Sequence, residues 1–565
     1  MNLLLCALLI AAAPAAEDAR FEAFAQKYIQ DLLEREPETA TRLGDHRNDA
    51  RLDDYSVQGV QREVAAAKGG LAELARIDSK KLSAENGVDY RILKNRLDSN
   101  VYELETLRGW QWNPLQYNVG GAIYALISRD FAPPDQRLRS AIGRLNGVPA
   151  VVAAAKANLK SPPKVHTETA IQQNKGTVKL VKEQLEPLVK QAPALEKDFR
   201  AAQATALAAL ADYQQWLEKD LLPRSDGNFR LGDEKFRKKL RFALDSDLSK
   251  EEILRRAEAD LKSTRAAMYH TAVQMWPKLF PDKPVPMDQP AAIKAVLDEA
   301  AKKHPNNETI LAQATKDLDQ TTAFVREKGI VTVLDEPLEV VATPEFQRGV
   351  AVASCSPAGP LEKNKKTFYY ISPTPEDWSP QRVESFFREY NDAMLQETTI
   401  HEAMPGHYLQ LAHANRFRAP TLVRGIIFSG TFVEGWATYA EQLMADAGYG
   451  GPEVRMQQLK IRLRFILNAI IDQKIHTEEM TEQQAIARMM KDGFQEEGEA
   501  VGKWKRAQLT STQLSTYYVG NAEMNDIRAA WEQNHGKYPD LRALHDAMLS
   551  FGNAAPKYVR ERLGL

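Results

Sequence analysis

A chain of 565 residues with 44% hydrophobic and 27% charged side chains can bury a large core, which excludes wholesale disorder. Its 74 basic and 76 acidic residues leave a net charge of -2. Because no basic stripe stands out either, the composition argues against nucleic acid as a partner.

The first sixteen residues differ in character from those that follow. Residues 3–10 are apolar, small residues continue to Ala16, and two acidic residues come next. An apolar core with a small-residue cleavage site is typical of a signal peptide, whereas a membrane-spanning helix needs about 20 apolar residues. We therefore predict a signal peptide at residues 1–16 and a periplasmic or secreted mature protein without stable membrane insertion.

The two cysteines have different expected roles. Cys6 could suggest a lipoprotein, but it lies too near the start of the chain to end the apolar run. Cys355 would be alone after cleavage, so an exported chain would have no internal disulfide. Its stability would then depend on core packing and any bound metal.

Residues 17–328 predict a helical N-terminal lobe. Apolar residues recur there at spacings of three and four, which is the pattern of amphipathic helices. The clearest examples are residues 88–104, 150–159, 174–191 and 195–222. We expect these helices to be scaffold.

We predict that residues 329–565 form the catalytic region, and the residue pattern changes where this region begins. β-Branched and aromatic residues cluster in four short runs, and turn residues separate the runs. The runs are residues 330–334, 338–341, 350–353 and 367–371. We predict a small antiparallel β-sheet within residues 329–372, beside the active site, and helices from about Pro380 onward.

The segment 398–410 contains the residues that indicate chemistry, among them His401, Glu402 and His407. A zinc peptidase needs two imidazoles, a third ligand, an open position for water and a carboxylate that takes the water's proton. The common arrangement is H-E-x-x-H on one helix, because a spacing of four brings both histidines to the same face.

The two histidines here are six residues apart, which leaves them about 240° out of phase on an ideal helix. Pro405 and Gly406 lie between them. Proline cannot donate an amide to the carbonyl of His401, and glycine tolerates unusual dihedral angles. We therefore predict a kink or bulge that absorbs two residues and restores the phase of four.

A second segment places Glu434 on an otherwise apolar helix. An unpaired buried carboxylate is costly, and a bound metal removes that cost. Glu441 lies seven residues later on the same face, where it could orient a ligand imidazole through a hydrogen bond. The plain alternative is a pair of partly exposed helix glutamates.

These segments, His-Glu-Ala-Met-Pro-Gly-His at 401–407 and Glu-Gly-Trp-Ala-Thr-Tyr-Ala-Glu at 434–441, resemble the mostly bacterial family catalogued as domain of unknown function 885 (DUF885). The resemblance to this family covers most of the mature chain, and the family is similar to helical gluzincins such as thimet oligopeptidase, carboxypeptidase Taq and angiotensin-converting enzyme. It implies a mostly α, two-lobed, gluzincin-like metallopeptidase.

The resemblance also implies the site. It gives Zn2+ as the cofactor, His401, His407 and Glu434 as its ligands, and Glu402 as the general base. Tyr408 stands where family members often carry another histidine, which favours His407 as the ligand.

The resemblance continues in residues 515–520 and at Arg528. Helical gluzincins use a tyrosine or histidine from this part of the chain to donate to the oxyanion. Tyr517 is the first candidate and His545 the second, while Arg528 could hold a substrate carboxylate. Each could equally be a structural hydrogen-bond donor.

The expected activity is hydrolysis of peptide bonds, with short peptides as the substrate class. The strand at 367–371 could pair with an extended peptide, and we expect Tyr369 on it to contact substrate. Two alternatives remain: a zinc hydrolase acting on esters or non-peptide amides, and a catalytically silent peptide-binding protein. The intact Glu402 weighs against the second alternative, because a binding module has no need of a base.

Overall fold

The computed structural model describes residues 16–344, 348, 352–363, 366–536 and 540–565. The predicted signal peptide lies outside these residues, apart from Ala16 at the start of the first helix. No helix in the described ranges has both the length and the apolar character that crossing a membrane requires.

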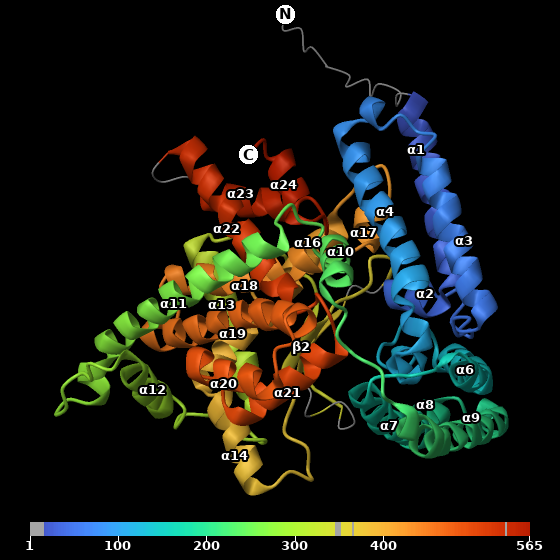
Figure 1. Cartoon of the computed structure of the whole chain (residues 1–565), viewed down its shortest axis with the longest axis horizontal. Coiled ribbons are helices and arrows are strands. Elements are labelled where there is room, and N and C mark those ends of the chain that lie inside the picture. Colours follow the sequence, from blue (N-terminus) through green and yellow to red (C-terminus); the bar gives the residue numbers. More distant parts are fainter. Residues whose placement is uncertain (1–15, 345–347, 349–351, 364–365, 537–539) are drawn as a thin grey trace, which may run out of the picture.

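The N-terminal helices gather on one side of the molecule, drawn in blue to teal in Figure 1. All the regions predicted as helices in this half are helical, and π-helical turns extend three of them. The helices are α1 (Ala16–Arg35), α2 (Pro37–Leu43), α3 (Val57–Leu74), α4 (Ala84–Tyr102), α5 (Gly120–Ala125), α6 (Pro134–Asn158), α7 (Lys164–Lys179), α8 (Glu186–Gln191) and α9 (Glu196–Trp216).

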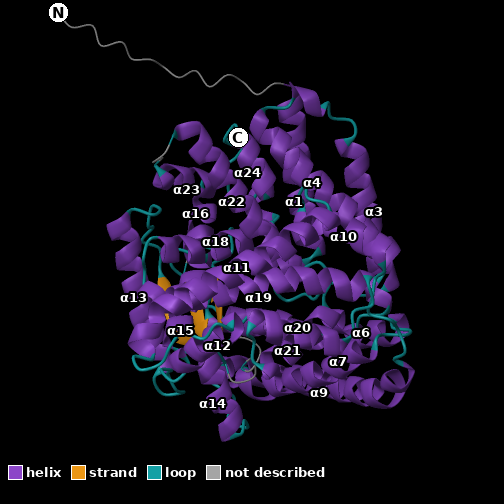
Figure 2. Cartoon of the chain, turned by 60° about the vertical axis from the view of Figure 1, so that its left-hand side comes forward, coloured by secondary structure: helices purple, strands orange, loops and turns teal. Residues whose placement is uncertain are grey.

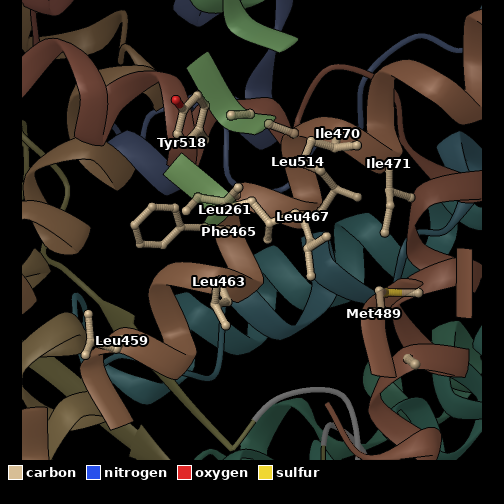
Figure 3. Packing of buried hydrophobic residues seen from close by; sticks show 14 of the residues in the cluster. Leu261, Leu459, Leu463, Phe465, Leu467, Ile470, Ile471, Met489, Leu514 and Tyr518 are labelled. Atoms are coloured by element: carbon tan, nitrogen blue, oxygen red, sulfur yellow. The ribbon is translucent and has the colours of Figure 1, made fainter. Parts of the chain in front are cut away.

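The next four helices share their buried cores with the C-terminal half, and α10 also packs against α4. They are α10 (Asp233–Leu244), α11 (Lys250–Leu279), α12 (Gln289–Ala300) and α13 (Ile310–Lys328). Leu261 of α11 shares a hydrophobic core with Leu463 and Leu467 of the long helix α19 (Gly451–Thr477), as Figure 3 shows. The buried cores therefore group residues 233–328 with the C-terminal half, so the expected division at residue 328 does not follow them.

The rest of the C-terminal half is also helical. Its elements are α14 (Pro380–Glu389), α15 (Asp392–Glu402), α16 (His407–Arg416), α17 (Val423–Ile426), α18 (Gly430–Asp446), α20 (Glu482–Gly493), α21 (Glu497–Leu509), α22 (Ser515–His535), α23 (Leu541–Leu549) and α24 (Pro556–Arg562).

A three-stranded sheet lies beside α13 and α15 (Figure 2). Its strands are β1 (Leu338–Ala342), β2 (Ala353–Ser356) and β3 (Thr367–Ile371), in the order β1-β3-β2. β2 pairs antiparallel with β3, whereas β1 pairs parallel with it. The prediction of an antiparallel sheet is therefore wrong for β1, because two reversals of the chain separate β1 from β3.

The predicted strand at 330–334 is absent from the described sheet. Side chains hold this segment instead: Thr332 donates its N–H and its hydroxyl to Asp546, and the carbonyl of Ile330 bonds to His545. Two of the four residues of the predicted strand at 350–353 lie outside the described residues, and its last residue begins β2.

Both edges of β3 are occupied, so the expectation that a peptide pairs with this strand is wrong. Tyr369 points into the protein, is fully buried, and its hydroxyl bonds to Thr399 of α15 at 2.9 Å. β2 is an outer strand of the sheet and contacts α15.

Helices α18 and α22 cross at two glycines. A Cβ on Gly435 would lie 2.6 Å from the backbone of Gly520, and a Cβ on Gly520 would collide with the carbonyl oxygen of Thr431. Because only glycine allows this approach, the two positions set how closely α22 lies to the helix that carries Glu434.

Candidate metal centre

The helix that carries His401 stops before it reaches His407. α15 ends at Glu402 and α16 begins at His407, and the N–H of Gly406 turns back to the carbonyl of Ile400 at 2.9 Å. A side chain on Gly406 would collide with the carbonyl oxygens of Ile400 and His401. The predicted interruption is therefore present, as a break between two helices rather than a bulge within one.

Trp436 fixes this break to the helix that carries Glu434. Its indole N–H donates to the carbonyl of Pro405 at 2.8 Å, and its side chain is fully buried. Trp436 lies two residues after Glu434 on α18. One hydrogen bond therefore links the loop between the histidines to the third member of the site.

His401, His407 and Glu434 converge. The Nε2 atoms of His401 and His407 lie 3.6 Å and 3.5 Å from Oε2 of Glu434, and the two imidazole centroids are 4.7 Å apart. The three ligand atoms all lie within 4.8 Å of one another. Ligands about 2.1 Å from a tetrahedral zinc ion would lie about 3.4 Å from one another, so the group fits such an ion.

The hydrogen bonding of Glu434 also fits a metal. Its Oε2 is buried and has no hydrogen-bond partner among the described residues. Burial raises the pKa of Glu434, but the interactions with His401 and His407 outweigh it and hold the pKa well below its usual range. The carboxylate is therefore ionised and available as a ligand.

Glu441 orients His401, as expected for a residue that forms a hydrogen bond to a ligand imidazole. Its Oε1 lies 2.6 Å from Nδ1 of His401, so the other ring nitrogen faces Glu434. Burial lowers the pKa of His401, but the interactions with Glu434 and Glu441 outweigh it and raise the pKa well above its usual range. Glu441 is fully buried, so solvent does not compete for this bond.

Glu402 lies beside the group without belonging to it. The three residues that could hold a metal do not include Glu402, although it is the next residue after His401. Its Oε2 accepts a hydrogen bond of 2.9 Å from the backbone N–H of Cys355. A strand of the sheet thereby holds the carboxylate at the end of α15.

Tyr517 lies close enough for the charge on Glu434 to act on it. Burial raises the pKa of Tyr517, and the negative charge on Glu434 raises it further. Arg506 and Gln513 both donate to the phenolic oxygen, at 3.1 Å and 3.4 Å. Since the oxygen accepts both bonds, the Tyr517 hydroxyl proton is left to donate elsewhere.

The structure does not bring His545 into the metal group. The histidine is buried on α23, with Nε2 3.1 Å from the hydroxyl of Tyr439 and Nδ1 2.7 Å from the carbonyl of Ile330. Burial lowers the pKa of His545 to about 4. Both ring nitrogens are therefore engaged in internal contacts.

Arg528 is paired with acidic residues that do not belong to the metal group. It donates to Glu532 at 2.8 Å and lies 3.8 Å from Asp446, the last residue of α18. Twelve residues separate Asp446 from Glu434, a distance of about 18 Å along a helix. Tyr369 of β3 is buried between the sheet and α15, where its hydroxyl bonds to Thr399.

Sequence reasoning missed Glu397. Its side chain is fully buried, and neither carboxylate oxygen has a hydrogen-bond partner in the described part of the chain. Burial raises the pKa of Glu397 well above its usual range, and the charge on Glu441 adds to this rise. The available signal was its position four residues before His401, which places both on one helix face.

The fold and this site define a mostly helical protein with a candidate His-His-Glu metal centre. The chain belongs to the family described as bacterial protein of unknown function (DUF885), which matches residues 37–563. The expected family is thereby confirmed, whereas no comparison shows a relation to gluzincins. No curated protein matches the chain.

Two solved structures share the fold. One, from Shewanella oneidensis, is described as a "putative lipoprotein of unknown function"; it is 35% identical, has a TM-score of 0.82, and the match covers 96% of this chain and 100% of that one. The other, a "putative lipoprotein" from Colwellia psychrerythraea, is 18% identical with a TM-score of 0.80, and the match covers 97% and 98% of the two chains.

The contact between Glu441 and His401 gives a first prediction. Glu441→Gln should lower the metal affinity by about 10–100-fold, because the residue behind a ligand histidine sets its orientation and basicity. Competition with a chelator of known affinity measures this. Glu234→Gln, an exposed substitution on α10, serves as the control. Equal metal affinity in the Glu441 variant and the control would contradict the assignment.

Proposed function

We propose that this chain is a zinc-dependent peptidase that cleaves short peptides. The proposal is supported above all by the convergence of two imidazoles and one carboxylate, with a second carboxylate beside them that is not part of the group. The relation to helical gluzincins that the family resemblance implies agrees with the same activity.

The donor set favours zinc. Two histidine nitrogens and one carboxylate oxygen suit Zn2+, and three protein ligands leave a position open, as in catalytic zinc sites. The side chains of His401, His407 and Glu434 are 16%, 11% and 20% exposed, so the group is reachable from solvent. When bound there, zinc would supply Lewis acidity and lower the pKa of a water molecule.

The residues around the group have distinct roles in this proposal. Glu402 accepts the proton of the attacking water and delivers it to the leaving amine. The N–H of Cys355 holds the Glu402 carboxylate in position for both transfers. Tyr517 donates its hydroxyl proton to the oxyanion, because its oxygen already accepts from two other side chains.

We also propose that the chain is exported to the cell envelope. The apolar run at residues 3–10 supports this, as does the description of both similar structures as putative lipoproteins. N-terminal sequencing of protein recovered from the envelope should give a mature end near Ala16 or Glu17. Protein that begins at Met1 and is found only in the cytoplasm would contradict export.

The role of Glu402 leads to a prediction about catalysis. Glu402→Gln should keep the metal and the fold but lower peptide turnover by at least about a hundredfold, because general-base catalysis typically contributes about 10²–10⁴ in rate. A peptide library digested by wild type and variant and analysed by mass spectrometry measures this. The control substitution Glu234→Gln should leave turnover unchanged.

Three outcomes would separate the alternatives. A Glu402→Gln variant as active as wild type would place the base elsewhere. Cleavage of esters but of no peptide would leave a zinc hydrolase and overturn the peptidase. Binding of peptides without turnover by the zinc-loaded wild type would favour a silent binding protein.

A further inference from the structure

A pocket of about 570 Å³ lies where the N-terminal helices meet the sheet. Figure 1 shows α2 and β2 on the facing sides of these two parts of the molecule. The N–H of Leu361, in the loop between β2 and β3, donates to the carbonyl of Leu43 at the end of α2 at 2.8 Å. This bond joins the two walls, so the pocket is formed before any ligand binds.

The pocket and Glu402 share the strand β2. Ser354 and Ser356 line the pocket, and Cys355 between them donates its N–H to Glu402. Because successive side chains of a strand point to opposite faces, the pocket lies on the sheet face away from α15. A peptide that passes the outer edge of β2 would therefore reach both the base and the pocket.

Two arginines in the pocket wall have no carboxylate partner among the described residues. Arg129 donates to the carbonyls of Ser356, Pro357 and Lys366, at 2.6, 2.8 and 2.6 Å. Arg42, which is exposed, donates to the hydroxyl of Thr39 at 2.8 Å. These neutral acceptors satisfy N–H groups without cancelling either charge.

A third cation, His46, is already neutralised. Its ring nitrogens lie 2.9 Å from Asp49 and 2.6 Å from Glu362. Burial lowers the pKa of His46, but the hydrogen bonds to Asp49 and Glu362 outweigh it and raise the pKa to about 9. This trio carries one net negative charge at neutral pH, so the two arginines leave the pocket with one net positive charge.

The lining also contains aromatic side chains. Phe428 lines the pocket and is 45% exposed, an unusual state for a large aromatic side chain in the described structure. It lies two residues before α18, the helix that carries Glu434, and Tyr370 of the sheet faces the same pocket. The lining therefore offers apolar contact beside unpaired positive charge.

We infer that this pocket binds a carboxylate of the substrate, through Arg42 and Arg129, while the metal centre acts on a nearby peptide bond. The inference rests on the proposed peptidase function and narrows it to peptides with a free C terminus or an acidic side chain. A charge-assisted hydrogen bond between arginine and carboxylate is about twice as strong as a neutral one. Arg528, which sequence reasoning assigned to this role, is occupied by acidic residues of its own.

The test measures binding without turnover, on zinc-loaded Glu402→Gln protein. Four fluorescent tetrapeptides of one sequence carry Glu or Gln at an internal position and a free or amidated C terminus. We expect peptides that carry the carboxylate recognised by the pocket, either the free C terminus or the Glu side chain, to bind about tenfold more tightly than the matching neutral peptides. A difference in affinity between free and amidated peptides would show that the pocket binds the C terminus. A difference between the Glu and Gln peptides would show that it binds the side chain.

A second substitution assigns this preference to the pocket. Arg42→Gln should reduce the preference by about threefold, because one exposed ion pair contributes little more than that. Arg42 is exposed, so the fold should tolerate the change. Arg139→Gln, an exposed arginine of α6 outside the pocket, should leave the preference unchanged.

Equal affinity for all four peptides, or no binding of any, would overturn the inference. An equal effect of the Arg42 and Arg139 substitutions would also overturn it. The peptidase proposal is judged separately, with wild-type protein. Cleavage of all four peptides at equal efficiency would keep the peptidase and reject the pocket, whereas carboxylate-dependent binding without cleavage would keep the pocket and reject the peptidase.

Discussion

The carboxylate of Glu434, whose Oε2 is buried without a hydrogen-bond partner among the described residues, is the constraint around which the metal centre is organised. Leaving a buried charge without a partner costs about 3–5 kcal/mol, so its surroundings must compensate. The two imidazoles that do so come from separate helices, α15 and α16. The break between these helices, which only glycine at position 406 allows, is therefore a requirement of the site.

Other contacts maintain this arrangement from outside. Trp436 ties the break to α18, Glu441 fixes the ring of His401, and the strand β2 holds Glu402. The glycine crossing sets how closely α22, the helix that carries Tyr517, lies to α18, the helix that carries Glu434. The strand that holds Glu402 also forms a wall of the pocket with unpaired arginines, so catalysis and recognition would share one element.

Sequence reasoning predicted the local features and failed on those that depend on pairing. Helix periodicity located the N-terminal helices, and the chemistry of Pro405 and Gly406 predicted the interruption between the histidines. The direction of β1 and the central place of β3 depend on long-range pairing, which no local pattern contains. Of the two acidic residues near Arg528, Glu532 follows from the spacing of four on one helix, whereas Asp446 lies on another helix and has no local signal. Glu397 had a signal, the spacing of four from His401, that was not used.

Metal stoichiometry tests the central claim most directly. Protein stripped with a chelator, reloaded with zinc and dialysed should contain about one zinc per chain when analysed by mass spectrometry of the metal. His401→Ala and Glu434→Ala, checked for folding by circular dichroism, should lose stoichiometric zinc. If both variants fold and retain a full equivalent of zinc, these residues do not form the metal site, and the account of the centre is wrong.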